Sequence, residues 1–209
     1  MRFSIFCVVL TVICGVFAPV SGSAGLVIQS FSGGSNGVTN IHQTTSLNIL
    51  VGSNDVVISK LGFYDHNADG LLASHEVAIW TWTGGLVTSA TVPAGTVAEL
   101  IGQWRMVDIT PVTLNANQKY RIGTQVFGDR YIFNGFVGPF DPAVGPVAPR
   151  SGYINGPGLN FPASDASGRY NANAFISTSS VPEPSSILLL GLCALGCVAI
   201  RRQRKGALR

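Results

Sequence analysis

HEVAIWTWTGGLVTSATVP, residues 75–93, is the stretch that decides the fold class. Its first half, Glu76–Trp82, places successive side chains on two opposite faces, which is the period of a β-strand. Two glycines then interrupt the apolar run, and a second strand-like segment, Leu86–Val92, follows and ends at Pro93. Two strands joined by a short Gly-Gly turn predict an antiparallel β-hairpin.

The rest of the body repeats this pattern of short apolar runs separated by turn residues, with few charges and no long segment at helical spacing. The sequence predicts further strands at Leu26–Phe31, Leu47–Val51, Val56–Phe63, Arg105–Ile109, Tyr120–Phe127, Tyr131–Phe133 and Tyr170–Ile176. Such spacing favours an all-β fold, a single antiparallel β-sandwich of the jelly-roll type over residues 25–180. A body of this length can bury a core of its own.

Residues 134–169 differ from the rest of the body, because six prolines and seven glycines fall within them. Such a composition predicts a long loop region, and long loops in compact domains are often binding loops. Aromatic residues recur through the segment at Phe136, Phe140, Tyr153 and Phe161. We therefore expect this region to pack along the sandwich.

The N-terminal segment, residues 1–24, has the organisation of a secretory signal peptide. A short positive start, Met1-Arg2, precedes the apolar run Phe3–Phe17, and the small residues Gly22-Ser23-Ala24 offer a cleavage site. This segment predicts a signal helix that is removed after Ala24. The partners it implies are the export machinery and signal peptidase.

The C-terminal segment, residues 181–209, has three parts. The triplet Pro182-Glu183-Pro184 is held extended by its prolines. The apolar run 187–200 predicts a hydrophobic helix, but it is shorter than the about 20 residues that a membrane-spanning helix needs. A basic cluster that begins with Arg201 and Arg202 holds the end on the cytoplasmic side. One interpretation of this arrangement is a plain tail anchor.

The order of triplet, apolar run and basic cluster resembles the PEP-CTERM sorting signal of bacteria that secrete exopolysaccharide. The resemblance implies that a membrane transpeptidase-like enzyme, the exosortase, recognises Pro182, Glu183 and Pro184. It further implies cleavage near the triplet, so that residues 187–200 hold the chain in the membrane only until processing. The expected destination is the cell surface or the extracellular matrix.

The charge and the cysteines of the chain are concentrated in these end segments. Between residues 25 and 180 there are seven Lys and Arg against nine Asp and Glu, a formal net charge of −2, although the whole chain is at +3. The basic character therefore belongs to the targeting segments and does not indicate nucleic-acid binding. All four cysteines also lie in the ends, so the body has neither disulfides nor thiol chemistry.

The segment DHNADGLLASHE, residues 65–76, matches the twelve-residue calcium loop of EF-hands. The predicted ligands are the side chains of Asp65, Asn67, Asp69 and Glu76 and the carbonyl group of Leu71. Gly70 permits the positive φ that the sixth position requires. A strand on each side can position this loop as helices do in EF-hands. We expect the ion to be structural and not catalytic, because a body without cysteines gains stability from any ion that binds only its folded state.

Two other interpretations of the same segment stay open. Asp, Asn and Gly favour surface turns for purely local reasons, so the loop can be a turn without an ion. A zinc site can be drawn from Asp69, His75 and Glu76, but neighbouring residues of a strand point to opposite faces. A hydrogen-bonded or solvent-facing role is the more common one for His66 and His75.

Residues 56–123 resemble an uncharacterised β-sandwich domain of secreted bacterial proteins. The residues that carry the resemblance are Gly62, Tyr64, Asp69, Gly70, His75, Glu76, Trp80, Leu114, Tyr120 and Gly123. The resemblance implies a fold and no activity.

Trp80 and Trp82 fall on one face of their predicted strand, opposite Val77 and Ile79. The β-branched pair is the better candidate for the core, which leaves the tryptophan face half-exposed or covered by residues 134–169. An exposed face would make an aromatic platform that stacks on sugar rings.

Sequence motifs of catalysis are missing: the chain has no Gly-x-Ser-x-Gly elbow, no phosphate loop and no paired histidines at metal spacing. These absences favour a protein without catalysis, and the resemblance to PEP-CTERM proteins implies a surface or matrix component associated with exopolysaccharide. The alternatives are a carbohydrate-binding module that uses Trp80 and Trp82, and a secreted hydrolase with two convergent carboxylates.

Overall fold

The computed structural model describes residues 24–32, 35–38, 42–134, 136–166 and 168–177. The predicted signal peptide, except for Ala24, lies outside these residues, and so does the sorting segment with its hydrophobic run 187–200. Within the described ranges no helix has the length and the hydropathy needed to cross a membrane.

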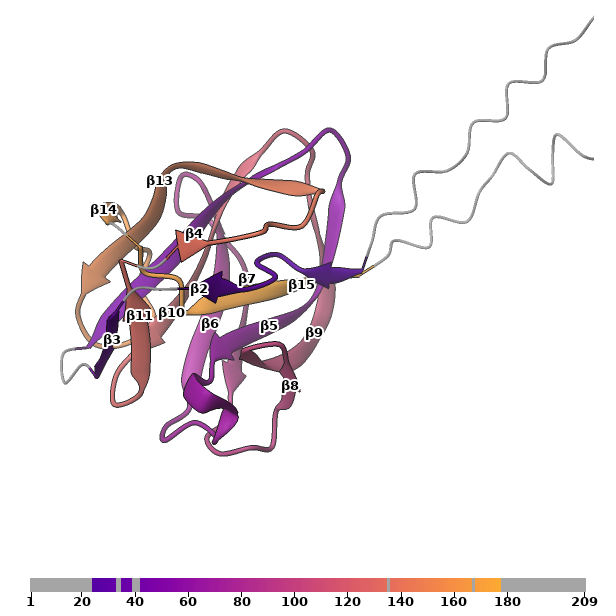
Figure 1. Ribbon diagram of the computed structural model, residues 1–209. Coiled ribbons are helices and arrows are strands. Elements are labelled where there is room, and N and C mark those ends of the chain that lie inside the picture. The colour runs from indigo at the N-terminus through magenta and orange to yellow at the C-terminus, as the bar shows by residue number, and fades with distance from the viewer. Residues whose placement is uncertain (1–23, 33–34, 39–41, 135, 167, 178–209) are drawn as a thin grey trace, which may run out of the picture.

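The described chain is built almost entirely of β-strands (Figure 1). The strands are β1 (Gly25–Leu26), β2 (Phe31–Ser32), β3 (Ser35–Val38), β4 (Gln43–Val51), β5 (Val56–Tyr64), β6 (His75–Thr81), β7 (Leu86–Val92), β8 (Glu99–Ile101), β9 (Trp104–Leu114), β10 (Lys119–Val126), β11 (Arg130–Phe133), β12 (Phe136–Val137), β13 (Val144–Asn155), β14 (Ser164–Ala166) and β15 (Ala172–Ser177). One short 3-10 helix, η1 (His66–Ala68), follows β5.

Two antiparallel sheets form the sandwich, which confirms the predicted fold class. The five-stranded sheet has the order β1-β15-β5-β9-β8, and the six-stranded sheet has the order β14-β13-β4-β10-β6-β7. Two small pairs, β11-β3 and β12-β2, lie beside them. Because β1 pairs with β15, the two described ends of the chain lie side by side, as Figure 1 shows.

The hairpin predicted from residues 75–92 is present as β6 and β7. Their register runs from His75 opposite Val92 to Trp80 opposite Leu86, with a bulge at Trp80. Gly84 occupies the turn with a φ of 100°, a conformation that costs a residue with a Cβ atom far more than it costs glycine.

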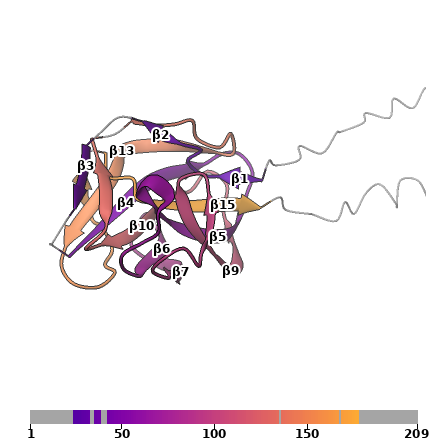
Figure 2. The ribbon, with the colours of Figure 1, turned by 60° about the horizontal axis from the view of Figure 1, so that its bottom comes forward.

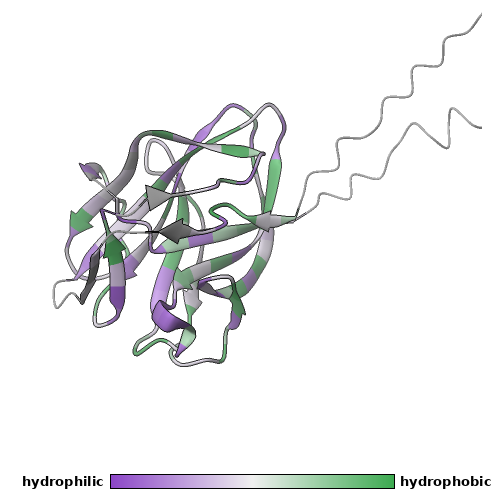
Figure 3. Cartoon of the chain, viewed as in Figure 1, coloured by the Kyte–Doolittle hydropathy of each residue, from purple (hydrophilic) through white to green (hydrophobic). Residues whose placement is uncertain are grey.

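The core lies between the two sheets and is filled by the inward side chains of both. Val77, Ile79, Ile122, Leu61 and Phe63 are among its fully buried members. Hydrophobic and hydrophilic residues alternate along many of the strands, as expected for a sandwich with one face of each strand in the core (Figure 3). The expectation that Val77 and Ile79 face the core is confirmed.

The prediction that residues 134–169 form one long loop is wrong over Val144–Asn155, which is a strand of the six-stranded sheet. The prolines led to the prediction of a loop, because proline rarely occurs inside a strand. They are compatible with this strand, because they fall where its ladder is irregular. The ladder between β13 and β4 is interrupted between Pro146 and Ser151, and prolines are tolerated in strands at such irregularities. The glycines fall mainly before and after the strand and around its bulge.

The part of this region that follows β13 packs on the outer face of the six-stranded sheet, as expected for its aromatic residues. The ring of Phe161 meets that of Trp80 edge to face, with centroids 6.2 Å apart. The amide of Asn160 donates to the hydroxyl of Thr44, and a carbonyl of the same segment, that of Pro162, accepts from Arg121. Residues 156–163 therefore close part of the outer face from solvent.

Candidate functional site

The loop between β5 and β6 lies at one edge of the sandwich, and its helix η1 comes to the front in Figure 2. Asn67 and Ala68 have positive φ values of 64° and 60°, and Gly70 has a φ of 103°. The amide of Gly70 donates to both carboxylate oxygens of Asp65, at 3.1 and 3.2 Å. The tight turn predicted at Gly70 is present, and Asp65 holds it from inside.

Asp65 is buried and forms an ion pair with Arg105 of β9, whose Nε lies 2.7 Å from Oδ2. The same guanidinium donates to three backbone carbonyl groups, those of Ala68 at 3.2 Å, Thr96 at 3.3 Å and Ala98 at 3.2 Å. Arg105 thus collects oxygen atoms from two segments, the loop itself and the residues before β8, much as a calcium ion collects the oxygens of its loop. The sequence did not predict this role, because Arg105 lies 40 residues from Asp65.

A second carboxylate, Asp129, holds the other side of the loop. Its two oxygens accept from the amides of Leu72 and Ala73, at 3.0 and 2.9 Å. It also accepts from Nε2 of His75 at 2.8 Å, and the fully buried imidazole stacks on Phe63 at a centroid distance of 3.6 Å. The hydrogen-bonded role expected for His75 is therefore confirmed.

The pKa of Asp129 reflects two opposing causes. Burial favours the neutral acid, but the hydrogen bonds from His75, Leu72 and Ala73 outweigh it and lower the pKa of this carboxyl group below its ordinary value. A carboxylate with a lowered folded pKa stabilises the fold above the unfolded value, about 3.9 for Asp, and this contribution is lost as the pH falls through the folded pKa.

Asp129→Asn is expected to lower the free energy of unfolding at pH 7 by about 1.5–3 kcal/mol, the usual contribution of hydrogen bonds to a charged group. Below about pH 4 the wild type loses the same contribution, so the two curves should converge there. Urea unfolding of both proteins at neutral pH and at successively lower pH measures the difference. A variant with the same acid dependence as the wild type would contradict this assignment.

An open cavity of about 470 Å³ lies between the loop and the start of β11. Its lining residues are His66, Asn67, Asp69, Gly70, Leu72, Asp129 and Arg130. The side chains of Asn67, Asp69 and Arg130 form no hydrogen bond or ion pair within the described part of the chain. The cavity thus presents free donors and acceptors, and its volume lies within the range of small-molecule sites, about 300–1,000 Å³.

The five predicted calcium ligands are divided among four places. Asp65 points inward to Arg105, Asn67 and Asp69 line the cavity, and Glu76 is exposed on β6. Leu71 is buried and forms a bridge with Gly95. No group of three or more His, Asp or Glu side chains among the described residues is arranged to hold a metal ion. Calcium binding stays a prediction of the loop sequence, and so does zinc binding.

The platform interpretation of Trp80 and Trp82 needs correction. Trp80 is only 5% exposed, because Phe161 covers one side of it, and Gly123 lies against its ring on the sheet. Trp82 is half-buried. A flat surface made of both indoles is therefore not present, although the expectation that residues 134–169 cover this face is confirmed at Phe161.

Comparison with known families supports the assignment of both parts of the chain. A family model described as a domain of unknown function (DUF4082) matches residues 50–176. A second model, the PEP-CTERM protein-sorting motif, matches residues 180–205 and includes the predicted triplet. No curated protein and no solved structure matches the chain.

Proposed function

The chain belongs to the family of the domain of unknown function DUF4082 and carries a PEP-CTERM motif, and from this premise we propose that it is a non-catalytic surface or matrix protein that binds exopolysaccharide. The sorting motif makes it a secreted protein processed by exosortase. The proposal adds the destination of the processed protein and the class of its ligand.

The observation that carries the proposal is the polar cavity of about 470 Å³ beside the loop of residues 65–76. Asn67, Asp69 and Arg130 offer both donors and acceptors to a ligand, and sugar hydroxyl groups use both. The exposed side chain of Leu72 adds an apolar surface on the same lining. Opposite charges on Asp69 and Arg130 leave no strong preference for a charged ligand.

The carboxylates of the cavity support a binding role over hydrolysis. Glycoside hydrolysis usually requires two carboxyl groups on either side of the bond. Asp129 already accepts hydrogen bonds from Leu72, Ala73 and His75, and a carboxylate held by three donors is a poor acid or base. Asp69 is then the free carboxylate of the lining.

Asp69→Ala combined with Arg130→Ala is expected to weaken exopolysaccharide binding at least tenfold, since one hydrogen bond to a charged group contributes about 1.5–3 kcal/mol. The measurement is cosedimentation of the processed protein with exopolysaccharide purified from an exosortase-bearing host. Asp108→Ala is the matched control, because its carboxylate is 83% exposed and lies on β9 away from the cavity lining.

Equal binding by the double variant and the wild type would exclude the cavity as the site. Release of new reducing ends during the incubation would favour the hydrolase alternative.

A further inference from the structure

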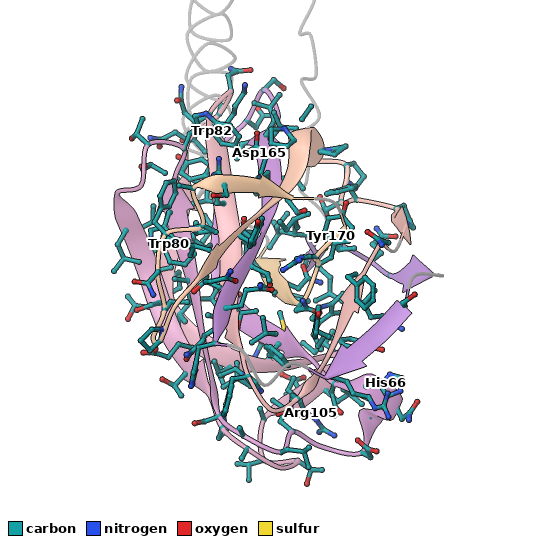
Figure 4. All side chains as sticks on the ribbon, turned by 90° about the vertical axis from the view of Figure 1, so that its left-hand side faces the viewer. His66, Trp80, Trp82, Arg105, Asp165 and Tyr170 are labelled. Atoms are coloured by element: carbon teal, nitrogen blue, oxygen red, sulfur yellow. The ribbon has the colours of Figure 1, made fainter. Side chains whose placement is uncertain are left out.

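A second group of residues, on the outer face of the six-stranded sheet, combines positive charge with aromatic rings. We call Trp82, Lys119, Arg121 and Phe161 the Trp82 cluster. Cζ of Arg121 lies 4.5 Å from the ring centroid of Trp82 and 5.2 Å from that of Phe161. Nζ of Lys119 lies 5.3 Å from the same Trp82 centroid. The cluster is distant from the cavity, since Trp82 and His66 lie at opposite ends of the sandwich in Figure 4.

Arg121 is a buried cation without a matching anion. It is only 5% exposed, its Nη1 donates to the carbonyl oxygen of Pro162, and its Nε is buried without a hydrogen-bond partner among the described residues. No described carboxylate forms an ion pair with it. Burial lowers the pKa of this guanidinium, while the more distant charge of Asp165 acts in the opposite direction.

An uncompensated buried charge is expensive, so a group that compensates the charge of Arg121 would stabilise the folded protein. The aromatic rings on either side supply part of the compensation through cation–π contacts. An anion that reached Arg121 and Lys119 would supply the rest. Charge-assisted hydrogen bonds from guanidinium and ammonium groups to carboxylates are among the strongest in proteins.

The outer side of the cluster is open to a ligand. Lys119 is exposed and Trp82 is half-buried, whereas Trp80 and the 156–163 segment close the inner side. Two cations lie over the Trp82 ring, so a sugar unit whose carboxylate meets Lys119 can also contact the exposed part of the indole.

We propose that the Trp82 cluster is a second binding site, which takes a carboxylate-bearing sugar unit of an acidic polysaccharide. This inference rests on the proposed function, because it names the acidic class of exopolysaccharide as one ligand of the protein. A polysaccharide fits better than a nucleic acid, which carries a charge about every 1.7 Å along a duplex, or about every 3.4 Å along one strand, and calls for an extended basic surface. The body has a net charge of −2 and only two cations in this cluster.

Tryptophan fluorescence can test the site directly, because Trp80 and Trp104 are buried and Trp82 is the accessible one of the three. The probes are oligogalacturonate and its methyl ester, which has the same chain without the charge. We expect oligogalacturonate to change the emission of the processed protein saturably and the ester to bind at least tenfold more weakly. Added salt should weaken the binding of the charged probe.

Lys119→Ala is expected to weaken oligogalacturonate binding about tenfold, and its exposed position should leave the fold intact. Lys60→Ala is the matched control, since Lys60 is a lysine of the other sheet and is bound to Glu99 and Asp108. Equal affinity for the ester, an unchanged Lys119→Ala variant, or tighter binding of single-stranded DNA than of oligogalacturonate would each overturn the inference.

The proposals for the cavity and for the Trp82 cluster can be contradicted separately. The Asp69→Ala and Arg130→Ala variant should keep its response to oligogalacturonate, because neither residue belongs to the Trp82 cluster. Oligogalacturonate binding without exopolysaccharide cosedimentation would contradict the proposed function and leave the anion site in place. Cosedimentation with exopolysaccharide without oligogalacturonate binding would support the proposed function and contradict the anion site at the Trp82 cluster.

Discussion

Arg105→Ala is expected to lower the free energy of unfolding by about 3–5 kcal/mol, the cost typical of removing one partner of a buried ion pair. The side chain of Asp65 is fully buried and that of Arg105 is 8% exposed, so the remaining carboxylate has no water to replace its partner. The variant also loses the bonds to Ala68, Thr96 and Ala98, which join the loop to the segment before β8. Urea unfolding at neutral pH, followed by circular dichroism, measures the change.

Lys60→Ala is the control for a general effect of removing a positive charge. Lys60 contacts Glu99 and Asp108, whose carboxylates are 60% and 83% exposed, and exposed ion pairs contribute about 0–1 kcal/mol. The double variant Asp65→Ala with Arg105→Ala should cost less than the sum of the single variants, because their side chains interact directly. An Arg105→Ala variant as stable as Lys60→Ala would show that the buried pair does not organise the loop.

The same set of proteins tests the predicted calcium ion. If calcium binds the loop as its sequence predicts, the wild type melts at a higher temperature in calcium than in chelator, and Glu76→Gln abolishes the difference. If Arg105 supplies the only cation that the loop needs, the wild type melts at the same temperature in both. Melting temperatures measured with zinc and with chelator test the alternative zinc site of Asp69, His75 and Glu76.

The hairpin of β6 and β7 could be predicted because its information is local. The alternation of Val77 and Ile79 with Trp80, and the glycines of the turn, all lie within 18 residues, 75–92. Strand β13 could not be predicted, because Pro146 and Pro149 obscure its pattern and its partner, β4, lies about 100 residues earlier. A bulge hides the alternation on which such predictions depend.

The candidate site was only partly predictable, because only some of its residues are close together in the sequence. Asp69 and the turn at Gly70 follow from a contiguous motif. The partners that define the site are distant in sequence: Arg105 reaches Asp65 across 40 residues, and Asp129 reaches His75 across 54. A single sequence carries no signal for such pairs. The motif therefore predicted a loop in the right place and could not show that an arginine, from another strand, binds its first carboxylate.

Replacing Pro182, Glu183 and Pro184 together by alanine is expected to abolish processing almost completely, because this triplet lies within the matched sorting motif. The uncleaved chain should then accumulate in the membrane fraction, whereas the wild type yields a shorter form outside the membrane. Antibodies against the body and against a tag after Arg209 distinguish the two forms in fractionated cells of an exosortase-bearing host.

The matched control is Ser185→Ala with Ser186→Ala, which changes the adjacent residues and leaves the triplet intact. The fold gives the cleavage a clear consequence. Only four residues lie between Ser177, the end of β15, and Pro182, and the five extended steps from one to the other span at most about 18 Å. An uncleaved protein would hold its sandwich close to the membrane. If the protein binds exopolysaccharide as proposed, processing would free the sandwich to reach that ligand. Normal release of the triplet variant, or release of the wild type from a strain without exosortase, would contradict this order of events.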